Sequence, residues 1–245
     1  MQTKWRTKLI LYLILVSLFF YGLNYIIFKD LPFMARLLTL QLGFVPISVI
    51  LITLFLNQLI ARREKTTRLA KLNMVIGSFF SEIGTPLLKL LPNFDPNRGE
   101  LSRELDLASQ WSDKDFSNAI KYLNKRDYKI KIQKDKLEEL RNFLLGKRIL
   151  LLRIVENPNL FEHESFTDLL QAMFHLTDEL AQRDDVRELP DTDYEHLAND
   201  IQRAYIMLIS EWLAYLQHLK DNYPYFYSLA VRTNPLNPDA SPEVV

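Results

Sequence analysis

The sequence contains no cysteine, only 6 glycines and only 4 histidines among its 245 residues. The absence of cysteine suits a chain on the cytoplasmic side of a membrane, although disulfide-free proteins occur in every compartment. None of the glycines has a spacing that cradles phosphate groups, and no serine lies in a nucleophile elbow, so neither a P-loop enzyme nor a serine hydrolase is predicted. The formal net charge is zero, which argues against a nucleic-acid-binding domain.

Charged residues are also missing from two long apolar runs near the N-terminus. Residues 9–28 and 37–60 contain no Asp, Glu, Lys, Arg or His, and a helix of about 20 such residues spans the roughly 30 Å of hydrocarbon in a bilayer. We expect two transmembrane helices joined by an external turn at residues 29–36, with residues 1–8 forming a cytoplasmic N-terminus. The second run and the lack of a small-residue cleavage site argue against a cleaved signal peptide. Spans without ionisable groups do not suit a proton relay.

Basic residues flank the two runs and predict their orientation. Lys4, Arg6 and Lys8 precede the first run, whereas the turn contains only Lys29 and Arg36. The basic residues after the second run are Arg62, Arg63, Lys65, Arg68 and Lys71. By the positive-inside rule, we expect both termini in the cytoplasm and the chain in the inner (plasma) membrane. The second basic group is expected to contact anionic lipid headgroups.

Polar or helix-bending residues inside the runs are few. The candidates for helix packing or for lining a pore are Asn24, Gln41, Pro46, Asn57 and Gln58. Asn24 and Gln41 both lie toward the external side and can hydrogen-bond to each other or across an oligomer. Pro46 is expected to kink the second helix. Ordinary packing of membrane helices explains these residues best, and a pore lined by several copies of the second helix is the alternative.

The rest of the chain has apolar spacing typical of helices and few of the alternating patterns typical of strands. We expect an all-α protein: a transmembrane hairpin, a membrane-exit helix at residues 61–92, a cytoplasmic helical domain at residues 93–232, and a disordered tail at residues 233–245. The expected later helices lie near residues 100–110, 113–125, 132–156, 164–183, 191–222 and 225–232. The expected N-terminal signals of three of these helices are Ser112, Ser165 and Asp191.

Charge is divided unevenly along the cytoplasmic part. Residues 114–153 contain 12 basic and 5 acidic side chains, and residues 154–245 contain 5 basic and 17 acidic ones. The simplest interpretation is that the two blocks pack as complementary faces of one domain. An alternative is that residues 121–136 rest on anionic lipids. Nucleic acid is a weaker alternative because the acidic block would repel phosphate, even though Tyr122 and Tyr128 offer rings for stacking.

The stretch FFSEIGTPLLKLL, residues 79–91, is similar to the phosphoacceptor box of sensor histidine kinases, with Glu82 and Pro86 at matching positions. Ser81 stands where that box has its histidine, and a serine hydroxyl does not replace the imidazole nucleophile without a new base. The glycine-rich motifs of a nucleotide-binding domain are also missing. The kinase hypothesis therefore fails, and we expect a helix bent at Gly84 and Pro86 beside an apolar packing surface.

Two histidines have carboxylates at helical spacing. His175 and Glu179 are four residues apart on one expected helix, and His196 and Asp200 are four residues apart on the next, so each pair shares a helix face. If the two helices form an antiparallel hairpin, the four side chains lie at similar height and suit zinc or iron. Because both pairs flank the apolar stripes of their helices, a solvated polar face is the preferred interpretation. Neither a metal nor another cofactor is predicted.

Two segments carry a family resemblance. LNMVIGSFFSEIGTPLL, which follows the apolar hairpin, and HLKDNYPYFYSLAVRTNP near the C-terminus together resemble an uncharacterised group of prokaryotic integral membrane proteins with two spans and a cytoplasmic helical domain. The resemblance implies a location in the inner membrane and no assigned activity, catalytic residue or ligand. The aromatic run at residues 223–235 is expected either to close the helical core or to bind a partner.

We therefore predict a non-enzymatic scaffold, sensor or regulatory subunit that is tethered to the membrane and acts through its cytoplasmic helical domain. Its expected partners are the lipid bilayer, an unknown protein and further copies of itself, and no nucleic acid. The alternatives are a subunit of an oligomeric ion channel lined by the second span and a metal-dependent helical-bundle enzyme.

Overall fold

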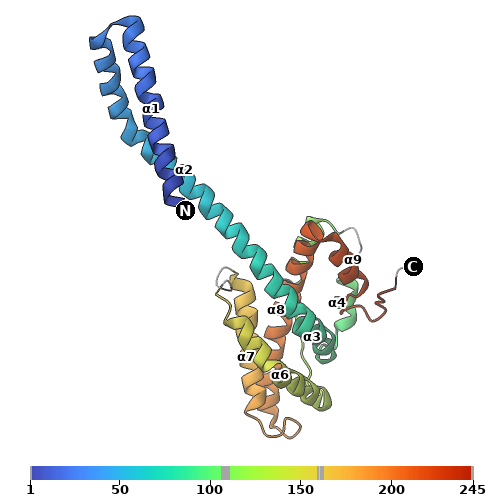
Figure 1. Ribbon diagram of the computed structural model, residues 1–245. Helices are drawn as coiled ribbons and strands as arrows, with labels where there is room; N and C mark the ends of the chain where they lie inside the picture. Colours follow the sequence, from blue (N-terminus) through green and yellow to red (C-terminus); the bar gives the residue numbers. More distant parts are fainter. Residues whose placement is uncertain (1, 106–110, 159, 161–162, 244–245) are drawn as a thin grey trace. The chain divides into compact units, whose positions relative to one another are not determined.

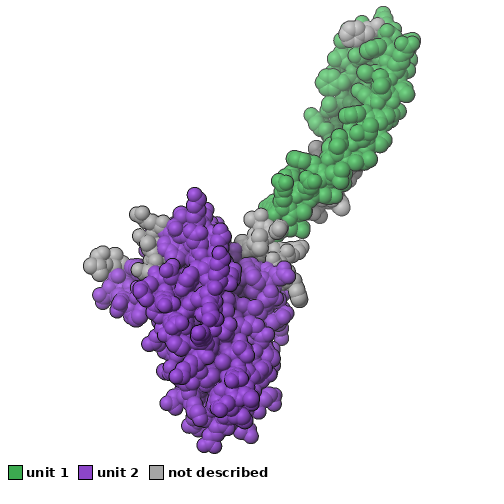
Figure 2. Space-filling model, turned by 180° about the vertical axis from the view of Figure 1, so that it is seen from behind, with its two compact units in different colours: residues 1–64 green, residues 65–245 purple. Residues whose placement is uncertain are grey.

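The chain folds into helices that belong to two compact units. The computed structural model describes the backbone of residues 2–105, 111–158, 160 and 163–243, and no strand occurs within these ranges. The first unit comprises residues 1–64 and the second residues 65–245; Figure 2 colours them separately. The prediction of an all-α protein is confirmed for this part of the chain.

The first unit is a helical hairpin (Figure 1). Helix α1 (Gln2–Phe28) is followed after two residues by α2 (Leu31–Phe79), whose first 34 residues belong to this unit. The apolar part of this stretch of α2 has a mean hydropathy of 2.2 and none of it is buried. Within the described side chains, the apolar part of α1 runs from Leu11 to Ile27. Length and composition therefore make α2 a candidate membrane span, with α1 as its shorter neighbour.

The turn of the hairpin is shorter than the expected residues 29–36. Only Lys29 and Asp30 lie between the helices, and Lys29 has a left-handed φ of 50°. The Asp30 carboxylate accepts a hydrogen bond from the backbone N of Phe33 at 3.0 Å, which caps α2. Pro32 falls in the first turn of α2, where its missing N–H has no helical partner to lose. The second apolar helix therefore begins at residue 31 rather than 37.

The second unit begins with the last part of α2, and there the helix changes its winding. A π-helical turn, η1 (Phe80–Gly84), is followed by α3 (Thr85–Leu90) and by a 3₁₀ turn, η2 (Leu91–Phe94). The backbone N of Thr85 bonds to the carbonyl of Phe80, five residues back. The wide turn immediately precedes Pro86, which cannot donate to the carbonyl four residues before it. The expected continuous helix over residues 61–92 is thus divided into the end of α2 and three further helical segments.

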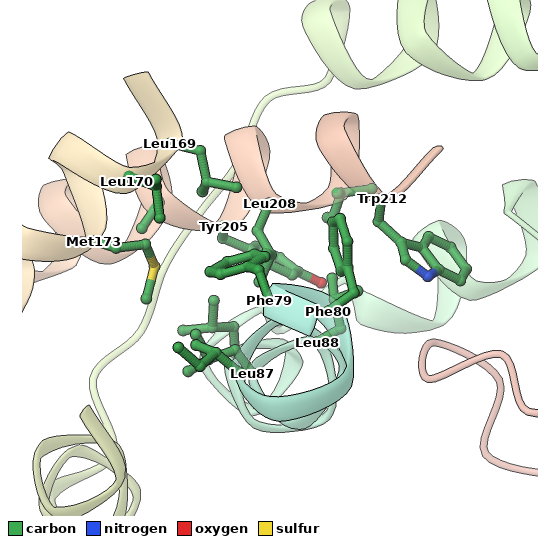
Figure 3. Packing of buried hydrophobic residues seen from close by; sticks show 14 of the residues in the cluster. Phe79, Phe80, Leu87, Leu88, Leu169, Leu170, Met173, Tyr205, Leu208 and Trp212 are labelled. Carbon is green, nitrogen blue, oxygen red and sulfur yellow. The ribbon is translucent and has the colours of Figure 1, made fainter. Parts of the chain in front are cut away.

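This segment packs into the core of the second unit (Figure 3). Helix α7 (Glu164–Ala181) and the 32-residue α8 (Asp191–Asn222) cover it. The buried side chains that Figure 3 labels are Phe79, Phe80, Leu87, Leu88, Leu169, Leu170, Met173, Tyr205, Leu208 and Trp212. Phe79 meets Phe166 edge to face, with ring centroids 5.2 Å apart. The apolar surface expected beside the bend at Gly84 and Pro86 therefore packs inside the domain.

The remaining helices begin within two residues of the expected positions. They are α4 (Arg98–Glu104), α5 (Asp113–Lys125), α6 (Lys134–Val155) and α9 (Pro224–Arg232). Helix α6 packs on α7, whereas α5 and α9 pack on α8. Residues 106–110, in the predicted helix at 100–110, lie outside the described residues. Regular apolar spacing located these helices because each buries one face in a common core.

Of the predicted caps of α5 and α7, one is confirmed and the other is wrong. Asp115 accepts hydrogen bonds from the backbone N and the hydroxyl of Ser112, both at 2.7 Å, so the predicted cap of α5 is confirmed. Ser165 does not cap α7. His163 does so instead, because its Nδ1 accepts from the backbone N of Phe166 at 3.3 Å.

The C-terminal tail is not disordered at its start, contrary to the prediction for residues 233–245. Asn234 and Leu236 are buried. The amide of Asn234 donates to the carbonyl O of Leu105 at 3.1 Å, and its Oδ1 accepts from the backbone N of Leu236 at 2.9 Å. Burial of Leu236 and the two hydrogen bonds of Asn234 thus connect this proline-containing segment to the domain.

The basic and acidic blocks meet mainly through α6 and α7. Arg148 lies 3.3 Å from Asp178, and Arg141 donates to the carbonyl O of Leu180 at 3.0 Å. Part of the basic segment 121–136 is itself interior. Arg126 forms a buried ion pair with Asp95 at 2.7 Å, and Tyr128 is buried. Neither Arg126 nor Tyr128 is therefore available to a lipid surface or to nucleic acid.

Candidate metal-binding site between α7 and α8

The four residues singled out as metal-ligand candidates lie on two neighbouring helices. His175 and Glu179 are one turn apart on α7, and His196 and Asp200 are one turn apart on α8. The two helices pack along each other and run in opposite directions (Figure 1). Residues at this spacing on facing turns come to the same height in an antiparallel pair.

The connection between the helices is held by a small set of hydrogen bonds. The hydroxyl of Tyr194 donates to the carbonyl O of Val186 at 3.2 Å and accepts from the backbone N of Leu189 at 3.2 Å. The side chain of Val186 is fully buried. These hydrogen bonds hold the loop between α7 and α8 and so fix the register of the two helices. The register sets whether the His175 and Glu179 pair lies level with the His196 and Asp200 pair.

The structure brings the ligand atoms together. One ligand atom each from His175, His196 and Asp200 lies within 4.8 Å of the others. Oδ2 of Asp200 is 3.3 Å from Nε2 of His175 and 3.3 Å from Nε2 of His196. A tetrahedral zinc ion with bonds of about 2.0–2.2 Å separates its donor atoms by about 3.3–3.6 Å. The two separations from Oδ2 of Asp200 to the histidine nitrogens have this size.

Asp200 contradicts the expectation of a fully solvated polar face. Only 8% of its side chain is exposed, compared with 46% for His175 and 50% for His196. Oδ1 of Asp200 lies 2.7 Å from the guanidinium of Arg203, whereas its buried Oδ2 has no hydrogen-bond partner among the described residues. A buried carboxylate oxygen without a donor is costly. A cation held between the two imidazoles would remove that cost.

Glu179 lies beside this trio and is shared with Arg183. Its Oε2 is 3.6 Å from Nε2 of His196 and 2.8 Å from the guanidinium of Arg183, and its Oε1 is 3.9 Å from Nε2 of His175. Arg183 also contacts both carboxylate oxygens of Asp193, at 2.6 and 2.8 Å. The hydrogen bond from Arg183 lowers the pKa of Glu179. Glu179 is therefore an anion that can complete the set through Oε1 while Arg183 retains Oε2.

Sequence reasoning missed the two arginines. Arg203 follows Asp200 by three residues, and Arg183 follows Glu179 by four. Arg203 shares a face of α8 with Asp200, and Arg183, just past the end of α7, contacts Glu179. Such second contacts orient metal ligands in known sites. The sequence signal for these contacts is the i,i+3 spacing of Asp200 and Arg203 and the i,i+4 spacing of Glu179 and Arg183. Spacing alone does not show that these pairs lie beside the histidines.

The polar candidates of the first unit do not form one cluster. The hydroxyl of Tyr21, not the amide of Asn24, donates to Oε1 of Gln41 at 2.8 Å. Asn24 lines the same pocket between α1 and α2 as Tyr21 and Gln41. Pro46 lies inside α2, and the side chains of Asn57 and Gln58 are exposed.

The basic candidates after the second apolar run are placed only in part. Arg62, Arg63 and Lys71 are exposed, and both arginines take part in interactions of their own. The side chains of Lys65 and Arg68 lie outside the described residues.

Comparison with known proteins gives the family. Residues 1–60 match the model described as "MJ1433, N-terminal helical domain", and residues 68–232 match "Uncharacterized protein MJ1433, C-terminal helical domain". The chain is 45% identical over 225 residues to "Uncharacterized protein MJ1433" of Methanocaldococcus jannaschii. The alignment covers 92% of this chain and 90% of the relative. No solved structure matches the chain. With both helical domains matched in order, the chain belongs to the MJ1433 family.

Proposed function

We propose that this chain is a membrane-anchored regulatory protein whose helical domain binds a divalent transition-metal ion between α7 and α8. The main observation that supports this proposal is that Oδ2 of Asp200 lies 3.3 Å from Nε2 of both His175 and His196. Imidazole nitrogen with carboxylate oxygen is a ligand set that zinc and iron accept. Glu179 offers a fourth donor on the same face of α7.

The regulatory role rests on where the ligands lie. The proposed ion joins α7 to α8, and α8 packs directly against η1 and α3, the segments that follow α2. Metal binding would therefore stabilise the packing of α8 against η1 and α3, which continue the chain after α2. This effect requires no catalytic chemistry. The exposed apolar surface of α2 within residues 31–64 and the basic residues that follow it support the membrane anchor.

Metal binding is tested on the full-length protein purified in detergent and treated with a chelator. Added zinc at about 100 times its dissociation constant is expected to raise the free energy of unfolding by about 2.7 kcal/mol. Isothermal titration calorimetry gives the affinity and the stoichiometry, and thermal unfolding gives the stabilisation. One ion per chain is the expected result.

The variants for this test are His175→Gln and His196→Gln, because both side chains are about half exposed and their replacement leaves the core intact. Each is expected to weaken zinc binding at least tenfold, because loss of even a hydrogen-bond partner of a metal ligand costs about 10–100-fold in affinity. Glu195→Gln is the matched control, since it removes an exposed charge from the same helix α8. Equal zinc affinity in His196→Gln and Glu195→Gln would contradict the proposed site.

A metal-dependent enzyme is the second candidate. A pocket of about 350 Å³ lies beside the site and is lined in part by His175, Gln171 and Arg203. A metal site with an open coordination position beside a pocket is the usual arrangement for hydrolysis. Zinc-dependent hydrolysis of p-nitrophenyl esters or phosphates that disappears in His175→Gln would favour this candidate over the regulatory one.

A further inference from the structure

A second polar feature lies in the same unit and shares no residue with the metal-ligand candidates. It is a pocket of about 630 Å³ between α4, the start of the C-terminal tail and one side chain of α8. The pocket is lined mainly by residues 98–103 and 235–239, together with Lys89, Pro92 and Tyr205. Its volume lies within the range of about 300–1,000 Å³ that small-molecule sites occupy.

The lining carries an excess of positive charge. Lys89, Arg98 and Arg103 contribute three cations, against the single carboxylate of Asp239. Arg98 donates to Oδ1 of Asn93 at 2.9 Å, and Nε of Arg103 donates to the carbonyl O of Gly99 at 3.1 Å. These bonds orient the two guanidinium groups, and no hydrogen bond within the described part of the chain occupies their remaining N–H donors. Among the described contacts, none of the three cations pairs with a carboxylate.

A buried hydroxyl in the lining also lacks a partner. Tyr205 is fully buried, and its hydroxyl forms no hydrogen bond within the described part of the chain. Its ring meets the ring of Tyr128 edge to face, with the ring centroids 6.2 Å apart. Burial raises the pKa of Tyr205, so the group stays a protonated donor. A buried donor without an acceptor destabilises the protein until an acceptor reaches it.

Apolar groups supply the other half of the lining. Pro92, Leu101, Pro235 and Leu236 bring hydrocarbon surface to the same pocket. Ser102, partly buried, adds a hydroxyl. Guanidinium and ammonium groups next to apolar side chains suit a ligand with a strongly anionic end and an organic body.

From this combination we propose that the pocket binds the phosphate group of a small organic molecule, with Lys89, Arg98 and Arg103 neutralising the phosphate and Tyr205 donating from the pocket floor. The tail residues 235–239 form one wall, so the ligand would contact the same segment that Asn234 and Leu236 hold on the domain. This inference does not rest on the proposed metal site, because the two sites share no ligand residue.

The test measures ligand-induced stabilisation of the full-length protein in detergent. The soluble probes are inorganic phosphate, pyrophosphate and AMP, at concentrations up to the millimolar range. The lipid arm compares the melting temperature in nanodiscs of phosphatidylglycerol with that in nanodiscs of phosphatidylcholine. Stabilisation by a soluble probe identifies a metabolite, whereas stabilisation only by phosphatidylglycerol identifies a lipid headgroup as the source of the phosphate.

Three variants and a control decide whether the response comes from this pocket. Arg98→Gln and Arg103→Gln are expected to weaken binding of the best probe about tenfold each, because each removes a charge-assisted contact. Lys121→Gln removes an exposed positive charge from α5 and is expected to change the affinity less than twofold. Tyr205→Phe is expected to raise the melting temperature without ligand and to weaken binding, since it deletes the unpaired hydroxyl.

Two results would overturn the proposal. One is the lack of any stabilisation by the soluble probes and by phosphatidylglycerol. The other is a stabilisation that persists unchanged in Arg98→Gln, Arg103→Gln and Tyr205→Phe.

Discussion

Gly84 shows how a single residue decides the packing at the π-helical turn. A Cβ atom at this position would lie 2.5 Å from Cδ1 of Phe80 and 3.1 Å from Cε1 of Phe79. The ring of Phe80 has little freedom to move away because it stacks on Tyr215, with centroids 5.1 Å apart. We expect Gly84→Ala to lower the free energy of unfolding by about 1–3 kcal/mol, the usual cost of overpacking. Urea unfolding followed by circular dichroism measures the change.

Gly146→Ala is the matched control for that prediction. Gly146 lies inside α6, and a Cβ there meets nothing within 4 Å. The same substitution is therefore expected to raise the free energy of unfolding by about 0.5–1 kcal/mol through helix propensity. If both variants shifted stability in the same direction, the close contact at Gly84 would not be the deciding factor.

His218 predicts a dependence of stability on pH. Its Nδ1 lies 3.3 Å from Nδ2 of Asn73 and 3.2 Å from Nδ2 of Asn222, so the unprotonated nitrogen can accept from these amides. Burial lowers the pKa of His218 below its usual value of 6.5, although Asp221 acts in the opposite direction. The folded state therefore binds its proton less readily than the unfolded chain. This contribution to stability is present above pH 6.5 and is lost as the pH falls through the folded-state pKa.

The measurement for His218 is the melting temperature across that pH range, for the natural chain and for His218→Gln. Glutamine keeps a polar side chain but does not titrate. The natural chain is expected to lose more stability on acidification than the variant does. Parallel curves for the two proteins would assign the acid sensitivity to other groups.

Residue-level prediction succeeded where one residue type has one common role. The Ser112 and Asp115 pair is a standard start signal, and both of its predicted partners meet. His163 was not expected to cap α7, because a histidine caps only through an unprotonated ring nitrogen, and spacing does not reveal which nitrogen accepts.

At the scale of elements, helix positions were predictable and helix rotation was not. Apolar spacing gave α5 to α9 nearly to the residue, since each helix buries one continuous face. The meeting of His175, His196 and Asp200 depends on how far α7 and α8 are rotated toward each other. A modest rotation of either helix about its axis would move these side chains from a shared cluster to separate solvent-exposed positions. The sequence does not determine that rotation. The π-helical turn was likewise missed, because a proline bends or widens a helix in several ways.

The C-terminal tail carries an element-scale prediction. Asn234 bridges the carbonyl O of Leu105 and the backbone N of Leu236. Asn234→Ala would leave these two buried groups unpaired, so we expect the free energy of unfolding to fall by about 1–3 kcal/mol. Ser241→Ala, at an exposed position of the same tail, is expected to change it by less than about 0.5 kcal/mol. Chemical denaturation measures both, and equal small effects would mean that the tail contributes no stability.

At the scale of the whole molecule, the cysteine-free sequence permits a direct test of the membrane topology. A single cysteine at Lys29, in the turn of the hairpin, is expected to react with an impermeant maleimide in intact cells. A single cysteine at Ser117, exposed on α5, is expected to react only after the cells are permeabilised. Labelling of both sites in intact cells, or of neither, would contradict two spans with both termini in the cytoplasm. Lys29→Cys keeps a non-glycine residue at the left-handed position, so the turn itself is little disturbed.

Helix α8 carries His196 and Asp200 on one stretch and Tyr205 less than two turns further on. If both proposed sites bind their ligands, a ligand that shifts or stiffens this helix at one site would change the free energy of binding at the other. Thermodynamic reciprocity would then require that zinc alters the phosphate affinity by the same factor as phosphate alters the zinc affinity. A helix shared by the two proposed sites would in that case let the chain respond to two chemical signals jointly.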